Sequence, residues 1–111
     1  MQNWFAFNRE TVAALLSDGS NPESLHTIEY HFASKQFQGL EKAAVDLFKT
    51  EFEVTDAEEL QLDDGSIIYS FDATKDRLLD ITKIDQDTEV LLSIAEKYGI
   101  VYDGWGTYFV E

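Results

Sequence analysis

Strand and helix patterns follow one another along this chain in an order that few folds accommodate. Between residues 25 and 33, apolar or ring-bearing side chains alternate with polar ones, at the two-residue period of a strand with one buried face. The members on one face are His26, Ile28, Tyr30 and Phe32. A helix is predicted over 35–50, with Ser34 as its N-cap, because the apolar residues there recur at helical spacing and form one core-facing stripe. That stripe comprises Phe37, Leu40, Ala44, Leu47 and Phe48.

The second half of the chain repeats the combination of strand and helix. Alternation resumes over 52–55, is interrupted by acidic residues at 56–59, and returns at Leu60 and Leu62. The Asp64-Gly65 pair then favours a tight hairpin turn, followed by a return strand over 67–73. After a connection over 74–82, we predict a helix over 83–98 with Gly99 as its C′ residue, and a final strand-forming segment over 100–110.

A short helix is predicted before these elements, over 9–17, with Asn8 as its cap and Gly19 at its end. The loop 18–23 follows, on turn chemistry. The complete order of a leading helix, strand, helix, two strands, helix and strand predicts an α+β fold. We expect a ferredoxin-like βαββαβ sandwich, in which two helices pack on a four-stranded antiparallel sheet. The leading helix could help to cover the other face of that sheet.

Length and composition limit the class of protein. A chain of 111 residues with 44% apolar residues predicts one domain, residues 1–111, with one modest core. No apolar run approaches the ~18 residues that span a bilayer, so no membrane association is expected. The N-terminus does not resemble a signal peptide, and cysteine is absent. Together these features indicate a cytoplasmic protein.

The charge is strongly negative and unevenly distributed. Twenty-two acidic and eight basic side chains give −14, and residues 56–111 alone hold fourteen acidic and four basic side chains. Such a field repels nucleic-acid phosphates and attracts cationic partners, so direct RNA or DNA binding is not expected. The same charge could serve solubility alone.

Candidate catalytic and metal-binding residues are few. His26 and His31 fall on opposite faces of one strand and cannot act together there, whereas Glu29 and His31 share a face. One such pair supplies too few ligands for a metal, so neither a metal nor a cofactor is expected. The spacing of Asp85, Asp87 and Glu89 imitates a calcium loop without its glycine, and we interpret it as acidic complementation of a helix N-terminus. No nucleophile constellation is present, which predicts a non-enzymatic protein.

The interrupting acidic stretch and its neighbours are the candidate partner-binding residues. Five carboxylates fall within nine residues with no basic side chain, namely Asp56, Glu58, Glu59, Asp63 and Asp64. They form either a solvated connection and turn or a negative patch that steers a basic protein segment to the domain. Glu29 and His31, which share one face of the strand predicted over 25–33, are added as further candidates.

The motif Asp103-Gly104-Trp105-Gly106 is interpreted as structural. Glycines inside a strand mark a bulge or a close approach between chain segments, and no helix follows that could bind a phosphate. Trp105 either fills the core, which is favoured, or stands exposed as a binding anchor.

Several blocks of this sequence, in order, resemble one known family. They are the segment Ser17-Asp-Gly-Ser-Asn-Pro-Glu-Ser-Leu-His-Thr-Ile-Glu-Tyr-His-Phe32, the segment Leu40-Glu-Lys-Ala-Ala-Val-Asp-Leu-Phe48, the segment Phe52-Glu-Val-Thr-Asp-Ala-Glu-Glu-Leu60 and the ending Tyr102-Asp-Gly-Trp-Gly-Thr-Tyr-Phe109. The family is that of the regulators of ribonuclease E activity, type B (RraB). Glu51 stands where that family is expected to have glycine.

The resemblance implies an α+β sandwich that inhibits ribonuclease E by binding its non-catalytic C-terminal scaffold. That scaffold is implied to carry arginine-rich segments, which suit an acidic partner, and the family motif supplies no catalytic residues. The alternative is a non-enzymatic interaction or assembly module of the same fold that binds another basic protein.

Overall fold

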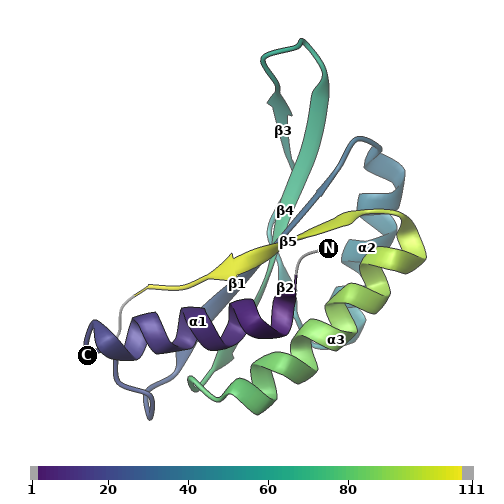
Figure 1. Ribbon diagram of the computed structural model, residues 1–111. Coiled ribbons are helices and arrows are strands. Elements are labelled where there is room, and N and C mark those ends of the chain that lie inside the picture. The colour runs from purple at the N-terminus through teal and green to yellow at the C-terminus, as the bar shows by residue number, and fades with distance from the viewer. Residues whose placement is uncertain (1–2, 109–111) are drawn as a thin grey trace.

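The computed structural model describes residues 3–108. The elements follow one another as α1 (Trp4–Ser17), β1 (His26–Ser34), α2 (Phe37–Lys49), β2 (Glu53–Val54), β3 (Glu58–Gln61), β4 (Ile67–Arg77), α3 (Ile81–Tyr98) and β5 (Val101–Gly106). Apart from the division of one predicted strand into β2 and β3, this is the order that the sequence predicts (Figure 1).

The sheet is antiparallel throughout, with β1 and β4 at its centre. β1 pairs with β5 on one side and with β4 on the other, and β4 carries both β2 and β3 along its far edge. If β2 and β3 are taken as one interrupted edge strand, the connectivity is that of the ferredoxin-like βαββαβ sandwich. The predicted fold class is confirmed.

The edge strand is interrupted by one extra residue. Val54 faces Ala73 and Glu58 faces Ser70, so residues 55–57 stand opposite only two residues of β4. Such an insertion breaks the hydrogen-bond ladder. Thr55 repairs part of it, because its N–H donates to the Asp72 carbonyl (2.9 Å) and its hydroxyl accepts from the Asp72 N–H (2.8 Å). The acidic stretch therefore stays beside the sheet.

β4 is longer than predicted. Its last four residues, 74–77, pair with residues 26–29 of β1, which reduces the predicted connection over 74–82 to residues 78–80. At its other end, β4 runs with β3 into a hairpin that projects from the body of the molecule (Figure 1). Large apolar side chains of this hairpin are exposed, namely Leu60, Leu62 and Ile67.

All three helices lie on one face of the sheet, contrary to the expectation that the leading helix covers the other face. In β1 the residues at even positions from His26 to Ser34 are buried, and those between them are not. Trp4 and Phe7 of α1 pack against the same core, and α1 also contacts α3 (Figure 1). The opposite face carries no described helix or strand.

The helix starts differ from the predicted ones. α1 begins five residues early, with Asn3 as its cap, because the Asn3 side chain accepts from the Ala6 N–H (3.1 Å). Asn8, the predicted cap, is fully buried in mid-helix. α3 is capped by Asp80, whose carboxylate accepts from the Thr82 N–H (2.9 Å). Ser34 is not the N-cap of α2, although its hydroxyl accepts from the Gln36 N–H (3.0 Å) just before the helix.

The predicted apolar stripe of α2 is only partly buried. Leu40 and Leu47 are in the core together with Ala43, whereas Phe37 and Phe48 are 46% and 74% exposed. Phe37 is the first residue of α2, and its ring contacts the ring of Tyr69 on β4 (5.4 Å between centroids). The buried face is centred on Leu40, Ala43 and Leu47, so Phe37 and Phe48 lie on its flank at 100° per residue and are left partly in solvent.

The three helices end in the same hydrogen-bonding pattern, which closes on a left-handed residue. That residue is Gly19 after α1, Gly99 after α3 and Glu51 after α2, with φ values of 96°, 66° and 72°. In each case the next residue donates its N–H five residues back, as Phe52 does to the Leu47 carbonyl (3.0 Å). Glu51 therefore adopts the conformation of the glycine expected in the family, although a Cβ atom disfavours it.

Replacing Glu51 with glycine is expected to raise the free energy of unfolding by about 1 kcal/mol, because the left-handed strain is removed. Urea denaturation followed by circular dichroism measures the change. Glu51→Ala is the matched control, since it removes the same charge but keeps the Cβ atom. An equal gain in both variants would mean that charge, and not backbone strain, limits stability at this turn.

Candidate functional site

Asp87 is the centre of a buried ionic cluster that joins α3 to the sheet. Its carboxylate accepts from the Tyr30 hydroxyl (3.0 Å) and from the Arg77 guanidinium through two bonds of 2.9 Å. Burial, together with the neighbouring carboxylate, raises the pKa of Tyr30 far above its ordinary value. The hydrogen bond to Asp87 likewise raises the pKa of Arg77. Tyr30 therefore holds its proton at neutral pH, and the cluster serves to fix the two layers together.

A second buried network joins α1 to α3 and β5. The Trp105 indole N–H donates to the Asn8 side-chain oxygen (2.7 Å), and the Asn8 amide donates to Asp85 and to Thr88 (2.9 Å each). Trp105 is 4% exposed, so its placement in the core is confirmed.

The two networks also correct the interpretation of Asp85, Asp87 and Glu89. None of the three lies in the first turn of α3, which contains no acidic residue. Asp87 and Asp85 are used in tertiary contacts instead, and only Glu89 is exposed. The spacing of these three residues showed that they are close to one another on one helix, but it could not show which other elements pack beside them.

The Asp103–Gly106 motif is structural in the way its glycines suggest. The register of β5 against β1 shifts at Tyr30–Phe32, which is the predicted irregularity. Gly104 has φ 90°, and a Cβ atom there would lie 3.2 Å from the Trp4 ring and 3.4 Å from the Phe7 ring. The close approach is therefore between β5 and the aromatic side chains of α1. Asp103 points away from them and is exposed.

The helix-free side of the sheet, called the open face from here on, is formed by the outward residues of every strand. The pairing register places six carboxylates there: Glu29, Glu53, Glu58, Asp72, Asp76 and Asp103. Lys75 and Arg77 belong to the opposite face, because they pair with the inward residues Ile28 and His26. Among the described strand residues, the outward positions hold no lysine or arginine.

His31 is the outward-facing histidine of β1. Its Nδ1 lies 2.8 Å from an Asp72 carboxylate oxygen, and both side chains are partly exposed. His26 is buried on the opposite side, beside the Ser20 hydroxyl (2.9 Å), which confirms that the two histidines lie on opposite faces of β1. Within residues 3–108, no three histidine or acidic side chains are grouped as a metal site requires.

The predicted acidic stretch does not form one patch. Asp56 and Glu58 border a small hollow of about 270 Å³ beside Asp72, on the open face. Glu59 pairs with Tyr69 and therefore belongs to the opposite side of the hairpin. Asp63 and Asp64 occupy the hairpin turn, where two hydrogen bonds from Ser66 lower the pKa of Asp64. Asp56 and Glu58 thus lie on the same face as Glu29 and His31.

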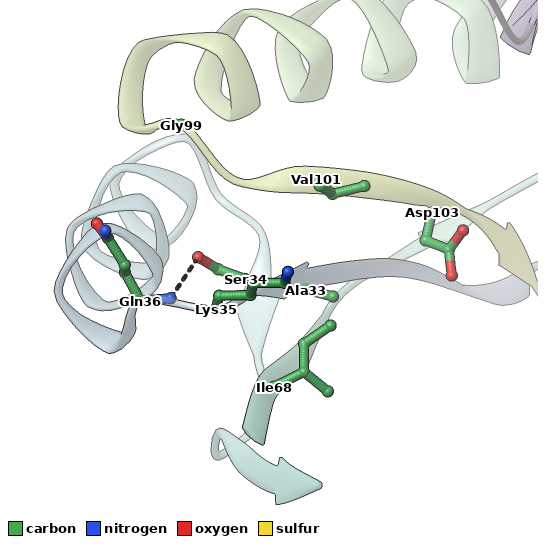
Figure 2. A pocket seen from close by; sticks show the side chains of 8 residues that line it. All are labelled: Ala33, Ser34, Lys35, Gln36, Ile68, Gly99, Val101 and Asp103. Atoms are coloured by element: carbon green, nitrogen blue, oxygen red, sulfur yellow. Dashed lines mark hydrogen bonds between the residues drawn. The ribbon is translucent and has the colours of Figure 1, made fainter. Parts of the chain in front are cut away.

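A larger hollow of about 520 Å³ lies at the end of the open face nearest α2 (Figure 2). Its apolar lining comes from Ala33, Ile68 and Val101, on the three strands β1, β4 and β5. Ala33 pairs directly with Val101 on one side and with Ser70 on the other, so the smallest side chain lies between larger neighbours. Asp103 and Lys35 border the hollow.

Sequence reasoning missed Glu53, Asp72, Asp76 and this hollow. The alternation over 67–73 already placed Ile68 and Asp72 opposite the core residue Phe71. It could not show that the face they share is left uncovered, since this depends on where α1 packs.

The fold and this face define a class of protein: a ferredoxin-like α+β sandwich with three helices on one side and an acidic, uncovered sheet on the other. None of the described helices is both long and apolar enough to cross a membrane. Residues 5–107 match the family model described as "Regulator of ribonuclease activity B".

Curated relatives with that same name are similar over almost the whole chain. The protein of Pseudoalteromonas atlantica is 61% identical over 108 residues, covering 97% of this chain and 92% of the relative. That of Alteromonas mediterranea is 60% identical over 108 residues, covering 97% and 82%. That of Aeromonas salmonicida is 60% identical over 111 residues, covering 100% and 96%. The chain belongs to the family of regulators of ribonuclease activity B.

Truncating Trp105 tests its structural role. Trp105→Ala is expected to lower the free energy of unfolding by about 3–5 kcal/mol, because it opens a cavity in the core. Trp105→Phe keeps most of the ring but leaves the buried Asn8 oxygen without its donor, at a cost of about 1–3 kcal/mol. Denaturant titration measures both. A stability unchanged in both variants would contradict the core role and favour an exposed anchor.

Proposed function

We propose that this protein inhibits ribonuclease E by binding its non-catalytic C-terminal scaffold, and that it catalyses no reaction itself. The observation that carries the proposal is the open face, whose outward strand positions hold carboxylates and, among the described strand residues, no lysine or arginine. The relatives of this chain are named for ribonuclease regulation. Arginine-rich segments of the scaffold would be complementary in charge to this surface. Complementary charge of this kind raises the association rate and suppresses wrong partners.

The contact is assigned to the open face and its margins. Of the partner-binding candidates that the sequence predicted, Glu29, His31, Asp56 and Glu58 belong to this surface, and we add Asp72 and Asp103. The remaining candidates, Glu59, Asp63 and Asp64, lie on or near the projecting hairpin, where they would extend the negative field. Because charges near a binding surface act over about 8 Å at physiological ionic strength, they would steer more than they bind.

The proposal includes four further expectations from the sequence. We treat residues 1–111 as one domain, located in the cytoplasm, that acts without a metal or cofactor and does not bind RNA directly. The supporting argument is electrostatic, since a net charge of −14 opposes the approach of phosphates. The alternative is an assembly module that binds a different basic protein, and the inhibition experiment described next distinguishes the two.

Removal of the scaffold is expected to abolish inhibition. Cleavage of a labelled RNA by full-length ribonuclease E should slow when this protein is added, whereas an enzyme cut back to its catalytic domain should be unaffected. Equal inhibition of both enzymes would point to the active site as the target. No inhibition and no binding to the full-length enzyme would favour the assembly-module alternative.

Charge removal from the open face is expected to weaken binding. The triple variant Glu29→Gln, Glu58→Gln, Asp103→Asn should lose about tenfold in affinity for full-length ribonuclease E at low salt, and less as salt rises. The matched control is Glu41→Gln, Glu89→Gln, Glu96→Gln, which removes the same charge from exposed positions on α2 and α3. Titration calorimetry at two salt concentrations measures both. A similar loss in both triple variants would mean that net charge matters and the open face does not.

A further inference from the structure

The hollow at Ala33 is an apolar site within a largely acidic surface, and Lys35 is the one cationic side chain among the described residues that line it. Val101 is 60% exposed and stands beside Ala33 on β5, while Ile68 lies diagonally across from it on β4. Figure 2 shows these side chains lining the hollow, with Asp103 further along β5. Its volume of about 520 Å³ falls within the range of roughly 300–1,000 Å³ that is usual for binding pockets. An apolar side chain placed there would remove Val101 and Ile68 from water.

Carboxylates lie around this apolar site at distances that a polypeptide spans. The pairing register aligns Glu58, Ser70, Ala33 and Val101 in one row across four strands. Adjacent strands are ~4.8 Å apart, so Glu58 stands ~10 Å from Ala33, and the next outward row holds Asp72 and His31 about 7 Å along the strands. A segment that fills the hollow would therefore carry its neighbouring side chains over carboxylates.

The charge of the face limits what can occupy it. A second copy of this chain would bring two acidic surfaces together, and a nucleic acid would bring its phosphates against them. A cationic polypeptide meets neither obstacle. Its arginine or lysine side chains would pair with the carboxylates, and the apolar residue between them would enter the hollow.

We propose that the hollow formed by Ala33, Ile68 and Val101 accepts one apolar side chain of a basic protein segment that lies across the open face. This inference rests on the proposed function for the identity of the protein that carries the segment. It adds a second determinant to charge: the surface selects, among basic segments, those with a leucine-sized residue between their cationic residues. Such an anchor in a pocket is the usual source of specificity in a protein interface.

Two synthetic peptides test the selection directly. Both are twelve-residue arginine- and glycine-containing peptides, identical except for a central leucine in one and serine in the other. By fluorescence anisotropy, the unaltered protein is expected to bind the leucine peptide at least about tenfold more tightly, since burial of one such side chain is worth that much. Equal affinities, or no binding of either peptide, would overturn the proposal.

Two variants then locate the selection. Ala33→Gln fills the hollow with a polar side chain, and Val101→Glu replaces its apolar wall with another carboxylate; both are expected to reduce the preference for leucine to less than about twofold. Val101→Glu separates the two effects most clearly, because attraction by charge alone would make it bind both peptides more tightly. Val45→Glu, at a 51% exposed position on α2, is the matched control and should keep the full preference. A preference that survives in both hollow variants would place the apolar contact elsewhere.

Further measurements separate the occupants and the two proposals. Self-association of the unaltered protein that Val101→Glu abolishes, in sedimentation equilibrium, would assign the hollow to a second copy. Displacement of the leucine peptide by an RNA oligonucleotide would assign the face to nucleic acid. Leucine selection without binding to ribonuclease E would refute the proposed ribonuclease and leave the hollow assignment standing. Inhibition of ribonuclease E without leucine selection would refute the hollow assignment and leave the proposed ribonuclease standing.

Discussion

The buried carboxylate of Asp87 is the interaction on which the layered arrangement depends. It accepts hydrogen bonds from Tyr30 on β1 and from Arg77 at the end of β4, and so it joins α3 to the two central strands at one point. An unpaired charge at this depth would cost several kcal/mol, so the three groups must come together or not at all. The cluster therefore links the last residue of β4 to α3. The smaller Asn8–Trp105 network then places α1 against α3.

The position of α1 decides what the molecule presents to its surroundings. Because its aromatic residues pack over Gly104 and β5, on the side already occupied by α2 and α3, one side of the sheet is left bare. The exposed side is then set by the alternation of the strands, which turns six carboxylates outward while core residues point inward. The surface that we propose for a partner is thus a consequence of packing on the other side. The three relatives named for regulation of ribonuclease activity are 60–61% identical to this chain over the aligned residues, which makes the same arrangement expected among them.

Local patterns predicted the elements and their order well, and they failed where a distant contact decides the outcome. The alternation around Tyr30 and the glycine after Tyr98 reported buried faces and helix ends correctly, because both depend on neighbouring residues. Asn8 was mistaken for a cap, since a buried asparagine in mid-helix makes sense only with Trp105 beside it. The extra residue at 55–57 was visible as an acidic interruption, but its effect on the edge strand depends on pairing with Asp72. For the same reason, the sequence indicated several acidic residues of the candidate site and missed the hollow between them.

The unequal placement of lysine and arginine has a consequence for how this molecule moves toward another. Cationic side chains lie on or beside the helices and on the inward positions of β4, where they partly offset the carboxylates of the helices, whereas the outward positions of the described strands carry carboxylates without a lysine or arginine. The negative charge is therefore least compensated on the bare side of the sheet. In the field of a positively charged body, this asymmetry of charge favours orientations that turn the bare side forward before any contact is made. Random tumbling would otherwise present the wrong side in most encounters, so this alignment raises the fraction of collisions that are productive.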